Sequence, residues 1–217
     1  MPRAKRIFVP GDVLHITHRC HKKEFLLKFK RDRDRCRYWL FEARRRYDFC
    51  VINYMITCNH IHLLVHYRSL KSLSRSMQLV ASRTAQEYNL RKKRKGAFWE
   101  DRYHVSIIEM EDYLQRCYLY VDLNMVRTGK IRHPIEWEHS GYYELFCGRE
   151  RYQVLAIKEM INLLGYNSFE DFKESYPKLI YQALQNDKLL REPLWTEQRI
   201  IGPGTFTSSY SINLSMQ

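Results

Sequence analysis

A chain of 217 residues with 45% hydrophobic and 14% aromatic side chains can build a hydrophobic core, which excludes a disordered protein. The 37 Lys and Arg exceed the 24 Asp and Glu, for a formal net charge of +13. Residues 1–100 hold 24 of the basic residues but only 8 of the acidic ones, which indicates a surface that binds a polyanion such as nucleic acid.

Residues 13–127 alternate between strand and helix patterns. Period-two alternation of apolar side chains predicts four strands, over 13–20, 51–57, 60–67 and 103–110. Apolar residues three or four positions apart predict helices over 22–47, 70–90 and 111–127. The order β-α-β-β-α-β followed by a helix is the split-βαβ, ferredoxin-like arrangement, an α+β fold. We expect an antiparallel sheet with two helices on one face and the other face available.

The pattern changes near residue 150. Helical segments over 154–164 and 169–190 precede a polar tail that contains Gly202, Pro203 and Gly204. We therefore predict two parts, residues 1–148 and a helical appendage over 149–217 whose role the sequence does not indicate.

Six cysteines occur without a C-x-x-C pair, which is typical neither of a disulfide framework nor of a zinc finger. Residues 1–12 contain no apolar signal-peptide core, and no stretch approaches the roughly 18 apolar residues that a membrane span needs. We expect reduced thiols in a cytoplasmic protein that does not enter a membrane.

The segment Asn59–His66 (NHIHLLVH) suggests a site. Alternation along a strand puts His60, His62 and His66 on one face and the apolar residues on the other. Two imidazoles at i and i+2 can bind one metal ion, although surface histidines are the commoner explanation of such a short motif. Cys58 is a rival ligand that would favour zinc.

The predicted helix over 111–127 carries two stripes. The apolar stripe holds Leu114, Cys117, Tyr118, Val121 and Met125 and is expected to face the sheet. Tyr120 lies about 200° from Tyr118 and shares a polar stripe with Asn124, four residues on. An amide oxygen is a suitable third ligand for a hard divalent cation, but spacing alone also fits an exposed tyrosine.

Four blocks add specificity, namely PRAKRIFVPGDVLHIT, CNHIHLLVH, GAFWEDRYHVSII and EDYLQRCYLYVDLNMVRTGKI. Their order and spacing over residues 1–148 resemble the REP-associated tyrosine transposases, relatives of the single-tyrosine transposases in the HUH nuclease superfamily. By that resemblance His60 and His62 are the metal-binding pair, Tyr120 is the nucleophile and Asn124 is the third metal ligand. Cys58 and Met125 depart from the family pattern, which usually has Pro at both positions.

The resemblance implies cleavage of single-stranded or hairpin DNA through a 5′-phosphotyrosine, with Mg²⁺ or Mn²⁺ as cofactor and association with the nucleoid. The oligomeric state, monomer or homodimer, stays open. Basic residues are expected to contact the DNA backbone, and we select Arg3, Arg6, Arg44, Arg45, Lys92, Lys93, Arg102 and Arg127.

Two alternatives remain. The first is a non-catalytic nucleic-acid-binding regulator on the same fold, which would read bases with aromatic residues on the sheet face. The second is a zinc-binding regulator that uses Cys58, His60 and His62. Histidines on the central strand, together with Tyr120 and Asn124, favour the enzyme.

Overall fold

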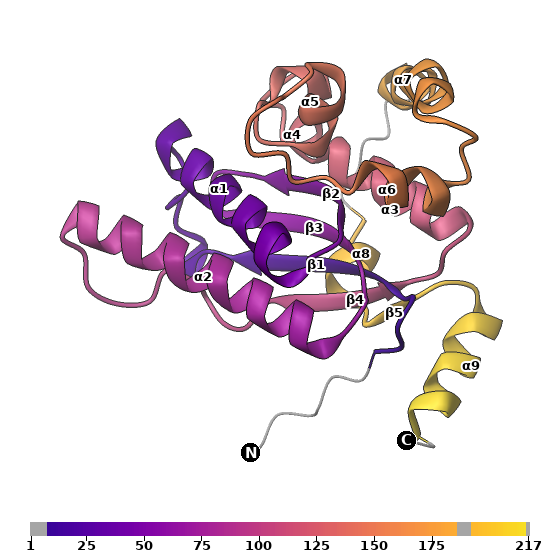
Figure 1. Cartoon of the computed structure of the whole chain (residues 1–217), viewed down its shortest axis with the longest axis horizontal. Helices are drawn as coiled ribbons and strands as arrows, with labels where there is room; N and C mark the ends of the chain where they lie inside the picture. The colour runs from indigo at the N-terminus through magenta and orange to yellow at the C-terminus, as the bar shows by residue number, and fades with distance from the viewer. Residues whose placement is uncertain (1–7, 186–191, 216–217) are drawn as a thin grey trace.

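A five-stranded sheet in the order β2-β3-β1-β4-β5 forms the centre of the computed structural model, which describes residues 8–185 and 192–215 (Figure 1). The strands are β1 Val13–Arg19, β2 Val51–Ile56, β3 His60–His66, β4 His104–Ile108 and β5 Ile200–Ile201. The first four pair antiparallel in the ferredoxin-like order, which confirms the predicted α+β fold class. β5 adds a short parallel pairing to β4 at the edge of the sheet.

Two long helices, α1 (Lys30–Tyr47) and α2 (Leu70–Lys92), pack against each other and cover one face of the sheet (Figure 1). The α2 N-terminus is capped by Ser69, whose hydroxyl accepts a hydrogen bond of 3.1 Å from the Ser72 amide. The buried α2 residues recur every three or four positions, as an amphipathic helix requires, and include Leu73, Met77, Val80 and Thr84.

The second face of the sheet, which the sequence suggested would be available, is covered. α3 (Asp112–Asp122) packs on β2, β3 and β4 through its buried apolar stripe. Further helices follow on this side of the sheet (Figure 1): α4 Asn124–Arg127, α5 Gly141–Phe146, α6 Ile157–Leu164, α7 Phe169–Gln185 and α8 Leu194–Glu197. The short 3-10 helices are His21–Lys23 and Pro134–Glu136. Enough apolar side chains follow residue 110 to bury this face as well, so the histidines of β3 lie beneath helices.

The segment after residue 148 shares the hydrophobic core of the sheet. Trp195 and Ile201 are fully buried there, and the Tyr176 hydroxyl donates a 2.7 Å hydrogen bond to Asp122 in α3. The expected polar tail is wrong in part, because it contains α8, β5 and α9 (Gly204–Ser215). The apolar pair Ile200 and Ile201 within that tail forms β5. The boundary at residue 148 stays a prediction, since these contacts do not show that either part folds alone.

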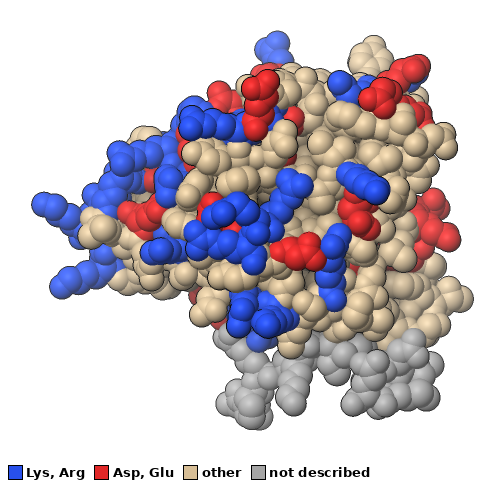
Figure 2. All heavy atoms as spheres, in the orientation of Figure 1, with Lys and Arg blue, Asp and Glu red and all other residues tan. Residues whose placement is uncertain are grey.

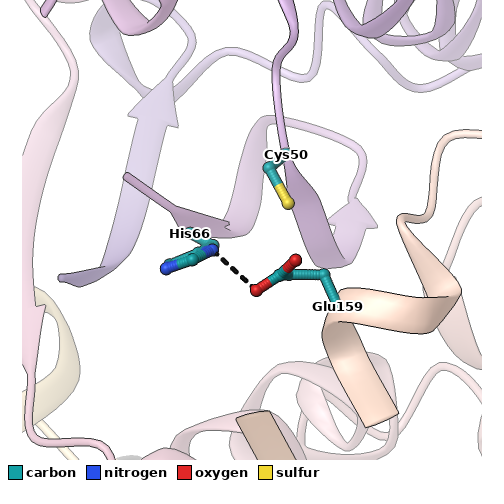
Figure 3. Close-up of side chains that lie close together, drawn as sticks. All are labelled: Cys50, His66 and Glu159. Atoms are coloured by element: carbon teal, nitrogen blue, oxygen red, sulfur yellow. Dashed lines mark ion pairs between the residues drawn. The ribbon is translucent and has the colours of Figure 1, made fainter. Parts of the chain in front are cut away.

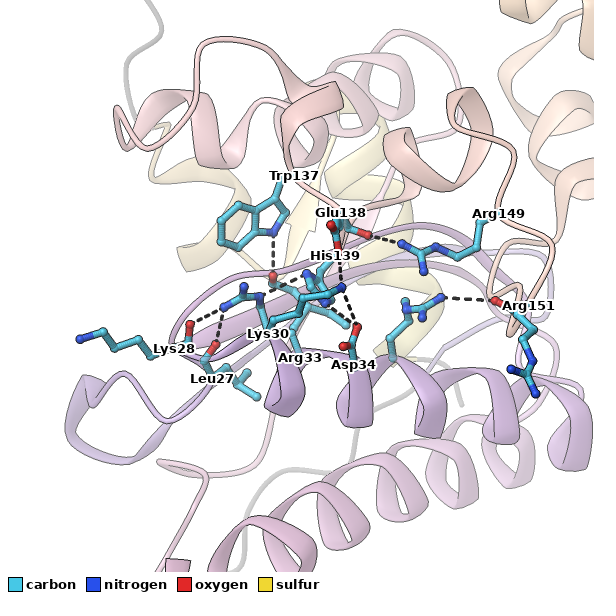
Figure 4. Close-up of polar contacts among 12 residues, drawn as sticks. Leu27, Lys28, Lys30, Arg33, Asp34, Trp137, Glu138, His139, Arg149 and Arg151 are labelled. Carbon is cyan, nitrogen blue, oxygen red and sulfur yellow. Dashed lines mark hydrogen bonds and ion pairs between the residues drawn. The ribbon is translucent and has the colours of Figure 1, made fainter. Parts of the chain in front are cut away.

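A polar network ties the loop before α5 to the start of α1 (Figure 4). His139 hydrogen-bonds Asp34 at 2.9 Å and accepts a 3.2 Å hydrogen bond from Arg33. The Arg33 guanidinium also lies 4.7 Å from the centroid of the Trp137 ring. These contacts fix residues 137–139 beside the helices of the opposite face.

In the described part of the chain no helix is both long and apolar enough to span a membrane.

Candidate active site

A pocket of about 640 Å³ opens where β1 ends and β3 begins. Its lining includes six residues that were singled out from the sequence, namely His60, His62, Tyr120, Asn124, Arg102 and Arg127. It also includes two further histidines, a third arginine and three acidic residues, namely His18, His104, Arg19, Glu100, Asp101 and Glu197. The structure therefore gathers the predicted catalytic and metal-binding residues at one place, together with two of the predicted DNA contacts.

His60 is held by the tight turn between β2 and β3. Its Nδ1 lies 2.7 Å from Oδ1 of Asn59, and the Asn59 amide is oriented by a 3.1 Å hydrogen bond from its Nδ2 to the Lys23 carbonyl. A carbonyl-type oxygen only accepts, so Nδ1 of His60 carries the hydrogen. The lone pair of this imidazole is therefore on Nε2.

His62 lies deeper, with 2% of its surface exposed, and both ring nitrogens have partners. Nδ1 is 2.9 Å from Nε2 of His15, and Nε2 is 3.1 Å from Nδ2 of Asn124. Burial lowers the pKa of His62 well below its usual range, and the nearby His60 adds to this effect. The ring is consequently neutral at physiological pH, the form that binds a metal.

Asn124 begins α4 immediately after α3 ends. The predicted continuous helix over 111–127 is interrupted at Leu123, whose φ and ψ are −82° and 2°. The Asn124 side chain is 8% exposed, and no described residue hydrogen-bonds its buried Oδ1. Such an atom costs free energy unless a ligand or water satisfies it.

Tyr120 is almost buried, with 5% exposed, although its spacing off the apolar stripe suggested a polar face. Its ring centroid lies 6.1 Å from that of His62 and 5.8 Å from that of Trp195. Arg127 lies over the ring and donates a hydrogen bond to the Tyr120 carbonyl. The side chain therefore faces the pocket among aromatic rings and one cation.

These residues fit a divalent cation. His60 and the neutral His62 both line the pocket, and the Asn124 amide with its unsatisfied oxygen lies beside Nε2 of His62. The amide oxygen of Asn124 suits Mn²⁺ or Mg²⁺, and these residues lack the thiolates that are typical of structural zinc sites. Cys58, the rival ligand, does not line the pocket.

The remaining predicted DNA contacts lie elsewhere. Arg44 and Arg45 lie at the far end of α1, where Arg44 donates to the Gln153 carbonyl and Arg45 pairs with Glu42 at 3.0 Å. Lys92 and Lys93 end α2, with Lys92 stacked on the Phe29 ring at 5.2 Å. Arg3 and Arg6 lie outside the described residues.

Lys and Arg side chains gather over α1 and α2 on the face shown in Figure 2, where acidic side chains are fewer. The segment that follows α2 connects this surface to the pocket. Its Glu100 amide donates a 2.9 Å hydrogen bond to the Arg19 carbonyl at the end of β1, and Arg102 lines the pocket. The basic surface is thus continuous in sequence with the rim of the site.

His66, the third histidine on this face of β3, is remote from the pair. Its Nδ1 lies 3.0 Å from Glu159 of α6, with Cys50 close by (Figure 3). Arg68 approaches both Glu159, at 3.5 Å, and the Cys50 sulfur, at 3.9 Å. With a cation already paired to these groups, the cluster is an ion-pair network between the sheet and α6.

Sequence reasoning missed His15 and Trp195. His15 is fully buried on β1, two residues before Thr17, which pairs with His62 across the sheet. Burial lowers the pKa of His15 to about 4. The alternation of VLHITHR does put His15 on one side of a strand, but the facing strand is not identifiable from the sequence alone.

Comparison with known proteins identifies the family of this chain. Residues 12–124 match the family described as "Transposase IS200 like". A solved structure described as "Structure of the REP associates tyrosine transposase bound to a REP hairpin" superposes with a TM-score of 0.55. Identity is 15%, over 71% of this chain and 90% of the other, so the likeness concerns the fold. Comparison with curated proteins gives no match.

The fold and the family match define a tyrosine-dependent transposase of the HUH type. The chain belongs to the IS200-like transposase family, since the match spans more than half of its length. The enzyme assignment from the sequence is thereby confirmed, as is the requirement for a divalent metal that this family implies.

Proposed function

We propose that this protein cleaves and rejoins single-stranded DNA beside a hairpin, with Tyr120 as the nucleophile and His60, His62 and Asn124 as the ligands of Mn²⁺ or Mg²⁺. The observation that carries the proposal is the convergence of Tyr120, the two Nε2 lone pairs and the unsatisfied Asn124 oxygen in one pocket. The DNA hairpin is taken from the solved structure that the chain resembles.

The cleavage step is an in-line displacement at phosphorus. The Tyr120 Oη forms a bond to phosphorus as the bond from phosphorus to the 3′ oxygen breaks. The phenol loses its proton to solvent, and the 3′ oxygen takes one up. A bound divalent cation supplies positive charge that polarises the phosphate and stabilises the leaving oxygen. The products are a 5′-phosphotyrosine and a free 3′-hydroxyl, which retain the energy needed for rejoining.

Neutral ligands suit this chemistry. Because two imidazoles and an amide leave the cation's charge uncompensated, the pocket favours an anionic phosphate. Arg19, Arg102 and Arg127 line the same pocket and provide cations for phosphate oxygens, while Glu100, Asp101 and Glu197 also line it. We propose that the strand passes from the basic end of α2, across Arg102, to Tyr120.

Tyr120 and both histidines of one chain line one pocket, so the proposed site is complete within a single chain. We therefore propose that Tyr120 acts in its own subunit and that a monomer is sufficient for cleavage. The protein would work in the cytoplasm on the nucleoid, where such DNA substrates occur.

The test uses a hairpin with single-stranded flanks, labelled at its 3′ end, incubated with the protein and Mn²⁺. The proposal predicts that the 3′ label migrates with the protein on a denaturing gel, whereas a 5′ label appears on a shorter strand. EDTA, His60→Ala or His62→Ala should abolish both products. Undiminished cleavage in EDTA would remove the metal, and binding without any adduct would favour a non-catalytic regulator.

A further inference from the structure

A buried chain of hydrogen bonds connects the C-terminal segment to the candidate metal site. The Trp195 carbonyl lies 2.8 Å from Nδ1 of His15, and Nε2 of His15 lies 2.9 Å from Nδ1 of His62. The two imidazole rings are nearly parallel, with 9° between their planes. Both Trp195 and His15 are fully buried, so water does not compete for these contacts.

The direction of these hydrogen bonds follows from the chemistry of the groups. A backbone carbonyl accepts only, so the hydrogen of His15 is on Nδ1. A second proton on His15 would make a buried cation whose hydrogen-bonding partners are a carbonyl and another imidazole, an arrangement that burial strongly disfavours. Nε2 of His15 is therefore an acceptor, and His62 donates to it from Nδ1. The lone pair of His62 is then on Nε2, which faces Asn124 and the pocket.

We propose that His15 is a positioning residue that holds His62 as its Nδ1–H tautomer and directs Nε2 toward the cation. This inference rests on the proposed function only in taking the pocket to be a metal site. Metal-bound histidines commonly donate their other N–H to a carbonyl or carboxylate, and loss of that partner weakens metal binding about 10- to 100-fold. Here the partner is a second histidine, itself oriented by the main chain.

The proposal gives the C-terminal segment a role in the site. The Trp195 carbonyl is held in place because the residues that follow α8 join the sheet. Ser106 of β4 donates a 2.5 Å hydrogen bond to the Gln198 carbonyl, and Ile107 donates one of 2.8 Å to Arg199. The Trp195 ring also packs on Tyr120. Trp195, which lies outside the matched family region, thus contacts Tyr120 and orients His15.

His60 shows the same arrangement by another route. Its Nδ1 faces Asn59, which the Lys23 carbonyl orients, so both histidines are set as Nδ1–H tautomers. For His60 the acceptor is the preceding residue. For His62 it is 47 positions away and is anchored by a carbonyl 180 positions further along the chain.

The experiment compares wild type with His15→Leu and His15→Gln. Leu removes both hydrogen bonds, whereas Gln keeps one donor and one acceptor on the same terminal group. Mn²⁺ affinity is measured without DNA, from the electron paramagnetic resonance signal of unbound Mn²⁺. We expect a 10- to 100-fold weaker affinity in His15→Leu and at least partial recovery in His15→Gln. His139→Gln, at a buried hydrogen-bonded histidine outside the pocket, is the matched control and should keep the wild-type affinity.

Nitrogen-15 NMR of the metal-free protein gives a second readout. The His62 signals should show a protonated Nδ1 in wild type and a mixture of tautomers in His15→Leu. If His15→Leu does not fold, the tautomer of His62 in the wild type and the Mn²⁺ affinity of His15→Gln still test the proposal. A protonated Nε2 on His62, or unchanged Mn²⁺ affinity in a folded His15→Leu, would overturn the proposal. Absence of Mn²⁺ binding in wild type would instead contradict the proposed function, while the NMR result would still test the tautomer.

Discussion

The guanidinium of Arg127 lies 3.9 Å from the centroid of the Tyr120 ring and donates a hydrogen bond to the carbonyl of the same residue. Burial lowers the pKa of Arg127, while Tyr120 acts in the opposite direction. One side chain therefore holds the nucleophile from two sides and places a cation where phenolate charge would develop.

Replacing Arg127 by Gln should slow formation of the covalent adduct about 10- to 30-fold, because a desolvated cation–π contact contributes up to about 2 kcal/mol. Arg127→Lys should recover only part of this rate, since Lys keeps the charge but not the planar group. Single-turnover kinetics at saturating DNA provides the measurement. Arg132→Gln removes an exposed arginine nearby and is the control. Equal rates in both Gln variants would exclude a role for Arg127 at Tyr120.

Asn124 separates metal binding from catalysis. Asn124→Ala should weaken Mn²⁺ binding about tenfold or more, because a ligand is lost. Asn124→Asp should bind Mn²⁺ more tightly but form the adduct more slowly, since the added negative charge repels the phosphate. Both quantities are measured on the same protein preparations. Faster adduct formation in Asn124→Asp would show that neutral metal ligands are not needed to attract the phosphate.

Stability at acidic pH depends on His139, which is buried between Asp34 and Arg33. Burial lowers its pKa to about 4 from the ordinary 6.5. Below pH 6.5 the unfolded chain takes up a proton that the folded chain takes up only near pH 4, so the free energy of unfolding falls across this range.

Between pH 7 and pH 5 this one group should remove about 2 kcal/mol of stability. His139→Gln can keep a donor and an acceptor but does not titrate, so its stability should fall by about 2 kcal/mol less over the same interval. Urea unfolding at the two pH values checks this. Parallel pH dependence in the two proteins would show that the pKa of His139 is the same in the folded and unfolded chains.

Binding to DNA should weaken steeply with salt, by about 0.7 log unit per log unit of salt for each single-strand phosphate neutralised. Lys92→Gln should reduce that slope by about 0.7 if the end of α2 contacts the backbone, while Lys178→Gln, at an exposed residue of α7, should leave it unchanged. A hairpin with a single-stranded flank should bind better than a full duplex. Equal affinity for both would contradict a site built for unpaired DNA.

Much of the site is predictable from local periodicity. Alternation along β3 correctly puts His60 and His62 together, with ring centroids 4.7 Å apart, because the geometry of a strand is fixed over two residues. The predicted pairing of Tyr120 with Asn124 in one pocket is also found, although the helix is interrupted at Leu123 between them.

The partners that complete the site are not predictable in this way. His15 reaches His62 through the register between β1 and β3, and Trp195 reaches His15 from the end of the chain. Strand register and long-range packing leave no period in the sequence. The burial of Tyr120 escaped prediction for the same reason, since residues far along the chain cover it.

Whether Tyr120 is the nucleophile is tested most directly by mass spectrometry, which locates the DNA-linked residue after protease and nuclease digestion of the covalent adduct. We expect a nucleotide joined to Tyr120 through its 5′ phosphate, no adduct in Tyr120→Phe, and an adduct in Tyr118→Phe. Tyr118 is the matched control, because it lies two residues away with its buried hydroxyl 2.9 Å from the Met160 sulfur, and its loss should cost only about 1 kcal/mol of stability. An adduct that persists in Tyr120→Phe, or a nucleotide found on any other residue, would contradict the account.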